Sequence, residues 1–194
     1  MNPTEPSAPG AFHPRSIERF PELAASAAEL LRKPPALLGL SPAEARCVVG
    51  HMQLLDYPKG ATLLREYDAA ATGYMLLLLS GEVSVDTAAP GHASDAVAIS
   101  SLGAGSLLGE MSLIDGEPRS TECTAISAVQ AAGLSRQGLD QLIAQQPQVA
   151  AKLLAEVASI IANRLRALSD QLRLYAQLTA SMQREIDRLK TAAR

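Results

Sequence analysis

Between residues 55 and 134 the chain is a succession of short apolar runs separated by residues that favour turns. Two of these runs, residues 82–86 and 96–100, alternate strictly between larger apolar side chains and polar or small ones, which is typical of strands with one buried face. The turn signals recur at Pro58-Lys-Gly60, Ser80-Gly81, Leu102-Gly-Ala-Gly105 and Asp115-Gly116. Many short strands joined by such turns predict an antiparallel barrel or sandwich, with residues 88–95 as the loop of a hairpin.

Helical patterns flank these predicted strands. Apolar residues spaced by three and four predict an amphipathic helix over residues 16–33, interrupted or started at Pro21 and ended by Pro34. A second helix is predicted from Ser41 to about Leu54, because Ser41 can cap the helix and Glu44 can complete a capping box. A short helix over residues 137–145 follows the strands, and Pro147 begins the next helix.

Four prolines among small polar residues mark the N-terminus. This composition predicts a disordered tail over residues 1–14. The rest of the chain divides by its patterns into an N-terminal helical segment (15–40), the β-domain (41–146) and a long C-terminal helix (147–194).

The C-terminal segment carries a heptad repeat. Two apolar series recur every seven residues, with Tyr175 and Thr179 as the imperfect positions: Ile161, Leu168, Tyr175, Met182 and Leu189, and Leu165, Leu172, Thr179 and Ile186. Such a seam predicts a coiled coil. We therefore expect a homodimer through residues 150–190, in which Glu185 and Lys190 are suited to an interhelical ion pair. The alternatives are a helix that packs on its own domain and a membrane-surface helix, although the polar face is mixed in charge rather than basic.

The segment from Gly103 to Thr121 combines glycine turns with a carboxylate and a guanidinium. The carboxylate of Glu110 can accept hydrogen bonds from a sugar hydroxyl, and the guanidinium of Arg119 can bind two phosphate oxygens through parallel donors. Backbone N–H groups in a tight glycine turn can bind an anion. These groups suit a sugar phosphate, whereas the simpler interpretation is an ion pair between Glu110 and Arg119 across a turn.

This segment resembles the phosphate-binding cassette of the cyclic nucleotide-binding domain family. The family pattern runs Gly-Glu-x-[Ala/Ser/Gly]-Leu, a short turn and Arg-[Ser/Thr/Ala]-Ala, and this chain has Gly109-Glu-Met-Ser-Leu113, a turn, and Arg119-Ser-Thr121. Residues 57–66 look like the family's first strand pair, and residues 76–85 look like its central hairpin. The resemblance covers roughly residues 40–170. It implies an α+β fold in which an antiparallel β-barrel or jelly roll lies between N-terminal helices and a long C-terminal helix.

The resemblance also implies roles for the cassette residues. Glu110 is expected to take the ribose 2′-hydroxyl and Arg119 the cyclic phosphate. Ser120 and the backbone of Gly109, Glu110, Met111 and Ser112 would cap the remaining phosphate oxygens. Thr121 departs from the alanine usual in the family, and its hydroxyl would either bond the ligand or crowd it.

In relatives with a long C-terminal helix, that helix covers the nucleobase. Two registers of the helix are compatible with this sequence, one with Arg164 over the base and the other with Ser169. Arg164 could stack on a base and Ser169 could donate a hydrogen bond to one. Ordinary helix surface is the alternative for both. The hydroxyl of Ser120 does not decide between cAMP and cGMP.

Composition excludes several other classes of function. The net charge is −3, so the chain as a whole shows no basic footprint for nucleic acid. The two cysteines are far apart and the three histidines are scattered, so we expect neither a metal site nor a catalytic centre. We also expect no cofactor besides the nucleotide ligand. The longest apolar run, residues 74–79, is too short to span a membrane, and the N-terminus lacks a signal peptide, which predicts a cytoplasmic protein.

The sequence therefore predicts a non-enzymatic cyclic nucleotide sensor. Bacterial transcription factors of this kind place a helix-turn-helix domain after the long helix, and we expect none here. The sensor would then signal to an unknown effector protein through ligand-dependent contacts. The alternatives are a scaffold whose pocket is degenerate and a pocket repurposed for another anion such as a cyclic dinucleotide.

Overall fold

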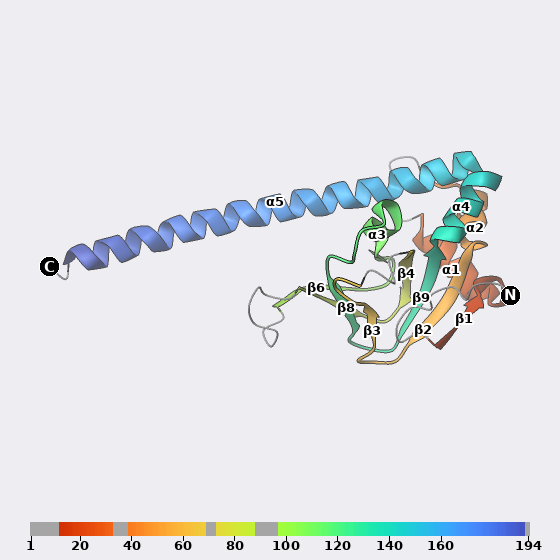
Figure 1. The fold of residues 1–194 in the computed structure, drawn as a ribbon, viewed down its shortest axis with the longest axis horizontal. Helices are drawn as coiled ribbons and strands as arrows, with labels where there is room; N and C mark the ends of the chain where they lie inside the picture. Colours follow the sequence, from red (N-terminus) through yellow and green to blue (C-terminus); the bar gives the residue numbers. More distant parts are fainter. Residues whose placement is uncertain (1–11, 33–38, 69–72, 88–96, 193–194) are drawn as a thin grey trace. The chain divides into compact units, whose positions relative to one another are not determined.

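A computed structural model describes residues 12–32, 39–68, 73–87 and 97–192. The chain forms two compact units, Met1–Glu156 and Val157–Arg194, which are considered separately (Figure 1). The first unit contains two antiparallel sheets and the helices around them, and the second consists of the long distal part of helix α5. This arrangement confirms the predicted α+β fold with an antiparallel β-structure and a long C-terminal helix.

Both sheets of the first unit are antiparallel and combine strands far apart in the sequence (Figure 1). The larger sheet has the order β1 (Phe12–Ser16), β2 (Met52–Tyr57), β9 (Val129–Ser135), β4 (Tyr74–Ser80) and β7 (Leu107–Leu108). The smaller sheet has the order β3 (Thr62–Leu64), β8 (Glu122–Ala125), β5 (Val83–Thr87) and β6 (Val97–Leu102). Strands β5 and β6 pair as a hairpin, as predicted, although its loop lies outside the described residues.

The core contains side chains from both sheets. Strand β4 is buried from Tyr74 to Leu79, which explains why its sequence is a continuous apolar run rather than an alternation. Leu76 and Leu78 join Leu63 of β3 and Val83 of β5 in one cluster, and all four side chains are fully buried. Each buried leucine of this kind stabilises the fold by about 1.5–3 kcal/mol. The aliphatic composition thus builds a core with few aromatic residues.

The chain changes sheet at Gly81, between β4 and β5. Gly81 has a φ of +85°, and a Cβ at this position would lie 2.3 Å from the carbonyl oxygen of Ala128. The predicted central hairpin over residues 76–85 is therefore wrong, because β4 pairs with β9 and β7 while β5 pairs with β6 and β8. The expected first strand pair is likewise divided between the sheets, since β2 pairs with β9 and β3 with β8.

Short helices frame the sheets. A 3-10 turn, η1 (Ile17–Arg19), precedes α1 (Pro21–Leu30), and α2 (Pro42–Val49) ends before β2. The predicted extension of the second helix to Leu54 is wrong, because Met52 to Leu54 pair with β9 instead. Strand β1 begins at Phe12, which pairs with Asp56, so the predicted tail over residues 1–14 is too long; residues 1–11 lie outside the described residues. Helix α4 (Arg136–Gln145) leads into α5 (Pro147–Ala192).

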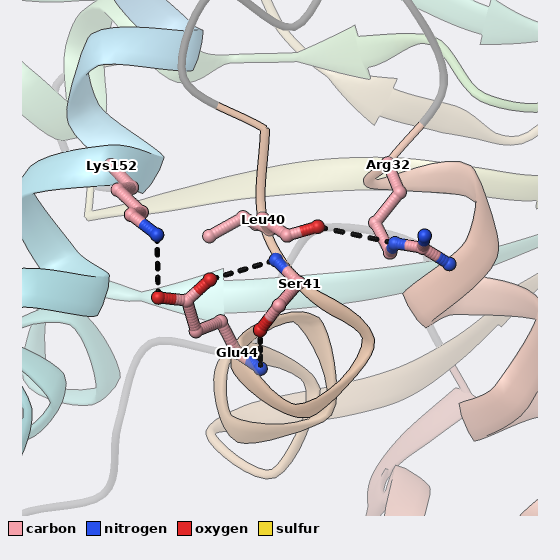
Figure 2. Close-up of polar contacts among 5 residues, drawn as sticks. All are labelled: Arg32, Leu40, Ser41, Glu44 and Lys152. Atoms are coloured by element: carbon pink, nitrogen blue, oxygen red, sulfur yellow. Dashed lines mark hydrogen bonds and ion pairs between the residues drawn. The ribbon is translucent and has the colours of Figure 1, made fainter.

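The capping box predicted at Ser41 is present (Figure 2). The hydroxyl of Ser41 accepts from the N–H of Glu44, and the Glu44 carboxylate accepts from the N–H of Ser41 at 2.7 Å. The same carboxylate pairs with the ammonium of Lys152, at 2.7 Å, near the start of α5. Close by, the guanidinium of Arg32 donates to the carbonyl of Leu40 at 3.1 Å. Glu44 thus connects the N-terminus of α2 with the domain end of α5.

These contacts make Glu44 sensitive to acid. The hydrogen bond from Lys152, followed by those from Ser41, lowers the pKa of Glu44 to about 2. A carboxyl with a lowered pKa stabilises the fold above its ordinary pKa, and this contribution is lost as the pH falls from about 4.5 to 2. We expect Lys152→Met to raise the pKa of Glu44 towards its ordinary value, as followed by NMR titration of the side-chain carbon. Arg46→Met, which changes a residue of the helix that carries Glu44, is the control and should leave the titration of Glu44 unchanged. An unaltered Glu44 titration in Lys152→Met would contradict the ion pair.

Tyr67 has the one positive φ among the described residues other than glycine, at 59°. Its side chain is 76% exposed, while its N–H donates to the carbonyl of Arg119 at 2.9 Å. The left-handed conformation costs a residue with a Cβ about 1–2 kcal/mol, and glycine avoids this cost but loses about 0.5–1 kcal/mol through backbone entropy. Tyr67→Gly should therefore raise the free energy of unfolding by about 0.5–1 kcal/mol and the melting temperature by about 1–4 °C. Tyr67→Ala keeps the Cβ and should give no such gain in calorimetry; equal stability of the two variants would contradict the strain at this position.

Candidate functional site

The candidate site begins where β7 ends. Gly109 follows Leu108 in the left-handed conformation, with a φ of 72°, and leads into α3 (Glu110–Asp115). A Cβ at Gly109 would lie 2.3 Å from Nη1 of Arg119, and no larger side chain fits there without moving the guanidinium. Glycine is therefore required at this position both by the backbone and by the close approach of the arginine.

Helix α3 places its polar side chains unequally. Glu110 is 2% exposed and Ser112 is also buried, together with Leu113. Met111 and Ile114 are exposed. Burial of a carboxylate and a hydroxyl in an aliphatic domain is costly unless polar partners satisfy them. The burial of Glu110 therefore indicates a polar site rather than an ordinary surface turn.

Arg119 is the most unusual residue of the site, because its side chain is 3% exposed. Nη1 donates to the carbonyl of Gly109 and Nη2 donates to the carbonyl of Tyr74, each at 2.6 Å. The guanidinium carbon also lies 4.8 Å from the centre of the Tyr74 ring. The guanidinium thus joins the turn before α3 to the first residue of β4.

Burial shifts the pKa of Arg119 and the pKa values of the nearby phenols in opposite directions. Desolvation lowers the pKa of Arg119, and the neighbouring Tyr74, Cys123 and Glu110 oppose this shift. An arginine nevertheless stays protonated in a protein. Burial also raises the pKa of Tyr74 to about 12 and raises that of Tyr57 further, so both phenols are neutral at physiological pH. The site therefore holds a positive charge shielded from water, beside phenols that are neutral.

The structure brings together some of the residues predicted for the site. Gly109 and Arg119 are in direct contact, and Glu110 follows Gly109. Ser120 is exposed and Thr121 is half-buried, between Arg119 and β8. The Arg119 carbonyl accepts from Tyr67, which anchors this segment to the residues after β3.

The two residues predicted to contact the base come from the other compact unit. Arg164 and Ser169 belong to the second unit, on α5, and the hydroxyl of Ser169 donates to the carbonyl of Leu165 at 2.9 Å within that helix. Their contact with a ligand in the first unit stays a prediction.

Sequence reasoning missed Tyr74. It begins the apolar run of β4, and a run of this kind predicts a buried strand without distinguishing its first residue. No local pattern could show that a carbonyl 45 residues from Arg119 accepts its hydrogen bond.

Two further kinds of feature are absent from the described residues. No group of three or more histidine, cysteine, aspartate and glutamate side chains there could hold a metal ion. No helix within the same residues is long and apolar enough to cross a membrane.

Comparison with known proteins identifies the family. The cyclic nucleotide-binding domain family matches residues 54–146, which include the whole cassette. A solved cyclic nucleotide-binding domain from Methylobacillus flagellatus is 32% identical, with a TM-score of 0.73, over 84% of this chain and 87% of that chain. The CRP-like cAMP-activated global transcriptional regulator of Mycobacterium tuberculosis is 28% identical over 74% of this chain, and the cyclic AMP receptor protein of Thermus thermophilus is 32% identical over 73%.

The chain spans 61% and 62% of the lengths of these two regulators. It covers 87% of the solved domain, and the TM-score of 0.73 shows that the two share a fold. The chain therefore belongs to the cyclic nucleotide-binding domain family and is related to the CRP-like regulators.

Proposed function

We propose that this protein is a non-enzymatic sensor that binds a cyclic nucleotide, cAMP or cGMP, at the segment from Gly109 to Thr121. The buried guanidinium of Arg119, in contact with the Gly109 turn, is the observation that carries this proposal. A cyclic phosphodiester has one negative charge and requires donors of fixed geometry, and a bidentate guanidinium supplies them. The names of the two regulators, which refer to cAMP, favour the same class of ligand.

Each residue of the segment has a role in this proposal. Arg119 pairs with the cyclic phosphate, and Glu110 accepts the ribose 2′-hydroxyl. Ser120, which is exposed, and the backbone from Gly109 to Ser112 cap the remaining phosphate oxygens. The phosphate oxygens would replace the backbone carbonyls as acceptors for Arg119, or would share its N–H donors with them. Arg164 or Ser169 would then contact the base from α5.

The second part of the proposal is a homodimer formed through α5. Seven residues of the predicted seam are between 42% and 69% exposed in a single copy of the chain: Leu165, Leu168, Leu172, Tyr175, Met182, Ile186 and Leu189. A helix with such a face is stable when a second helix covers it. In a single copy, Glu185 forms an exposed ion pair with Arg188 of the same helix, at 3.0 Å. In the proposed dimer, Glu185 would instead pair with Lys190 of the second copy, because an exposed pair of this kind contributes little stability.

A dimeric sensor of this kind would signal through ligand-dependent contacts with an effector protein in the cytoplasm. The acidic net charge of −3 favours a protein partner over nucleic acid. The ligand must bind one arrangement of the chain more tightly than another for the surface to change. A scaffold with a degenerate pocket, or one repurposed for a cyclic dinucleotide, is the second candidate. Thr121 in the place of the usual alanine favours it.

The ligand proposal is tested by calorimetric titration with cAMP and then cGMP. Arg119→Ala should weaken binding by about 2–5 kcal/mol, because the phosphate would be desolvated without its counter-charge. Arg119→Lys keeps the charge but not the bidentate geometry, and should retain part of the affinity. Arg46→Ala removes an exposed arginine of α2 and should bind as the wild type does. Equal affinities of wild type and Arg119→Ala would reject the assigned role of Arg119, and no binding by the wild type would favour the second candidate.

The dimer proposal is tested by a pair of leucines two residues apart on α5. Leu172 lies in the seam and is 69% exposed, whereas Leu174 lies outside it and is 54% exposed. Leu172→Lys should shift the protein from dimer to monomer in sedimentation velocity, because a charge would be buried in the seam. Leu174→Lys should leave the dimer intact. If the two variants sediment alike, the seam is not the dimer interface.

A further inference from the structure

We infer that Tyr74 is a positioning residue that fixes the guanidinium of Arg119 for the phosphate of the ligand. This inference rests on the proposed function of Arg119. Tyr74 contacts this side chain through both its backbone and its ring: its carbonyl accepts from Nη2 at 2.6 Å, and its ring centre lies 4.8 Å from the guanidinium carbon. Both contacts come from the first residue of β4, 45 residues away in the sequence.

The ring contact does not compete with a phosphate. A guanidinium donates hydrogen bonds in its own plane, whereas an aromatic ring interacts with its flat face. A ligand that binds the N–H groups of Arg119 can therefore leave the ring of Tyr74 in place. The ring limits the rotation of the guanidinium before the ligand arrives, and this reduces the ordering that binding requires.

Tyr74 is itself held firmly. Its side chain is 8% exposed, and its hydroxyl donates to the carbonyl of Leu63 in β3 at 3.3 Å. Its backbone pairs with Ser135 of β9. Burial raises the pKa of the phenol to about 12, so the hydroxyl keeps the proton that it donates to Leu63. Because β3 and β4 belong to different sheets, the position of the ring is set by both.

Tyr57 provides an internal comparison. It is 2% exposed and packs in the same core cluster, but its hydroxyl has no hydrogen-bond partner among the described residues. The carbonyl contact and the ring contact with Arg119 described above belong to Tyr74. Tyr57 is therefore a buried tyrosine of the same core with which Tyr74 can be compared.

The experiment compares the affinity for cAMP of wild type, Tyr74→Leu, Tyr74→Phe and Tyr57→Phe. Tyr74→Leu keeps the carbonyl but removes the ring, and should weaken binding about 3- to 30-fold, the range of a desolvated cation–π contact. Tyr74→Phe keeps the ring and should stay within about threefold of the wild type. Tyr57→Phe should not change the affinity. Wild-type affinity in Tyr74→Leu would overturn the inference.

A double-mutant cycle separates positioning from a general loss of structure. In an Arg119→Gln background, measured at millimolar cAMP, Tyr74→Leu should have no further effect on binding, because the group that it positions is absent. An equal weakening in both backgrounds would show that Tyr74 acts on the fold rather than on Arg119.

A measurement without ligand keeps the inference independent of the nucleotide. The side-chain N–H signals of Arg119 should be shifted by the ring current of Tyr74 and exchange slowly with water in NMR spectra of the free protein. The ring-current shift should persist in Tyr74→Phe and disappear in Tyr74→Leu, in which the N–H groups should also exchange faster because the ring no longer covers them. If the signals are present but cAMP and cGMP do not bind, the positioning role stands and the proposed ligand is wrong; if Tyr74→Leu leaves the signals unchanged, the positioning role is wrong.

Discussion

The buried guanidinium of Arg119 determines most of what surrounds it. Removing such a charge from water costs several kcal/mol, on the order of the stability of a whole domain, so it must be met by acceptors and by a polarizable surface. The Gly109 carbonyl, the Tyr74 carbonyl and the Tyr74 ring supply these contacts. A ligand phosphate would supply a full negative charge in the same place. An anion is the chemical class that a charge held in this way favours most strongly.

The order of strands in the two sheets brings Gly109 and Tyr74 to the guanidinium of Arg119. Gly109 comes from the end of β7, Tyr74 from the start of β4 and Arg119 from the residues before β8. Strands β4 and β7 pair in one sheet and β8 lies in the other, so the guanidinium connects the two sheets near α3. The positive φ of Gly109 turns the chain sharply enough for its carbonyl to face the arginine. Backbone conformation, sheet order and the position of the charge are therefore parts of one constraint.

Local patterns in the sequence predicted the elements better than their pairing. The capping box at Ser41, the hairpin over β5 and β6 and the helix from Pro147 depend on neighbouring residues, and all three are present. The strand pairs predicted for residues 57–66 and 76–85 were wrong, because in each case the turn between the two strands leads from one sheet to the other. The length of a turn does not show whether the strands that it joins belong to the same sheet. The same limit applies to the site: the cassette could be found from its spacing, but the contact of Arg119 with Tyr74 joins residues that no local pattern relates.

Helix α5 gives a physical basis for coupling the two proposed activities. Its first turns belong to the domain, where Lys152 pairs with Glu44, and its distal part carries the exposed heptad seam. If nucleotide binding changes the free energy of dimer formation, dimer formation must change the affinity for nucleotide by the same factor. Tight binding of the nucleotide would not by itself change the monomer–dimer equilibrium. A ligand alters such an equilibrium only through the difference between its affinities for the two states, here monomer and dimer. In the proposed sensor, the signal would therefore depend on how far α5 differs between the two states, rather than on how strongly Arg119 would bind the phosphate.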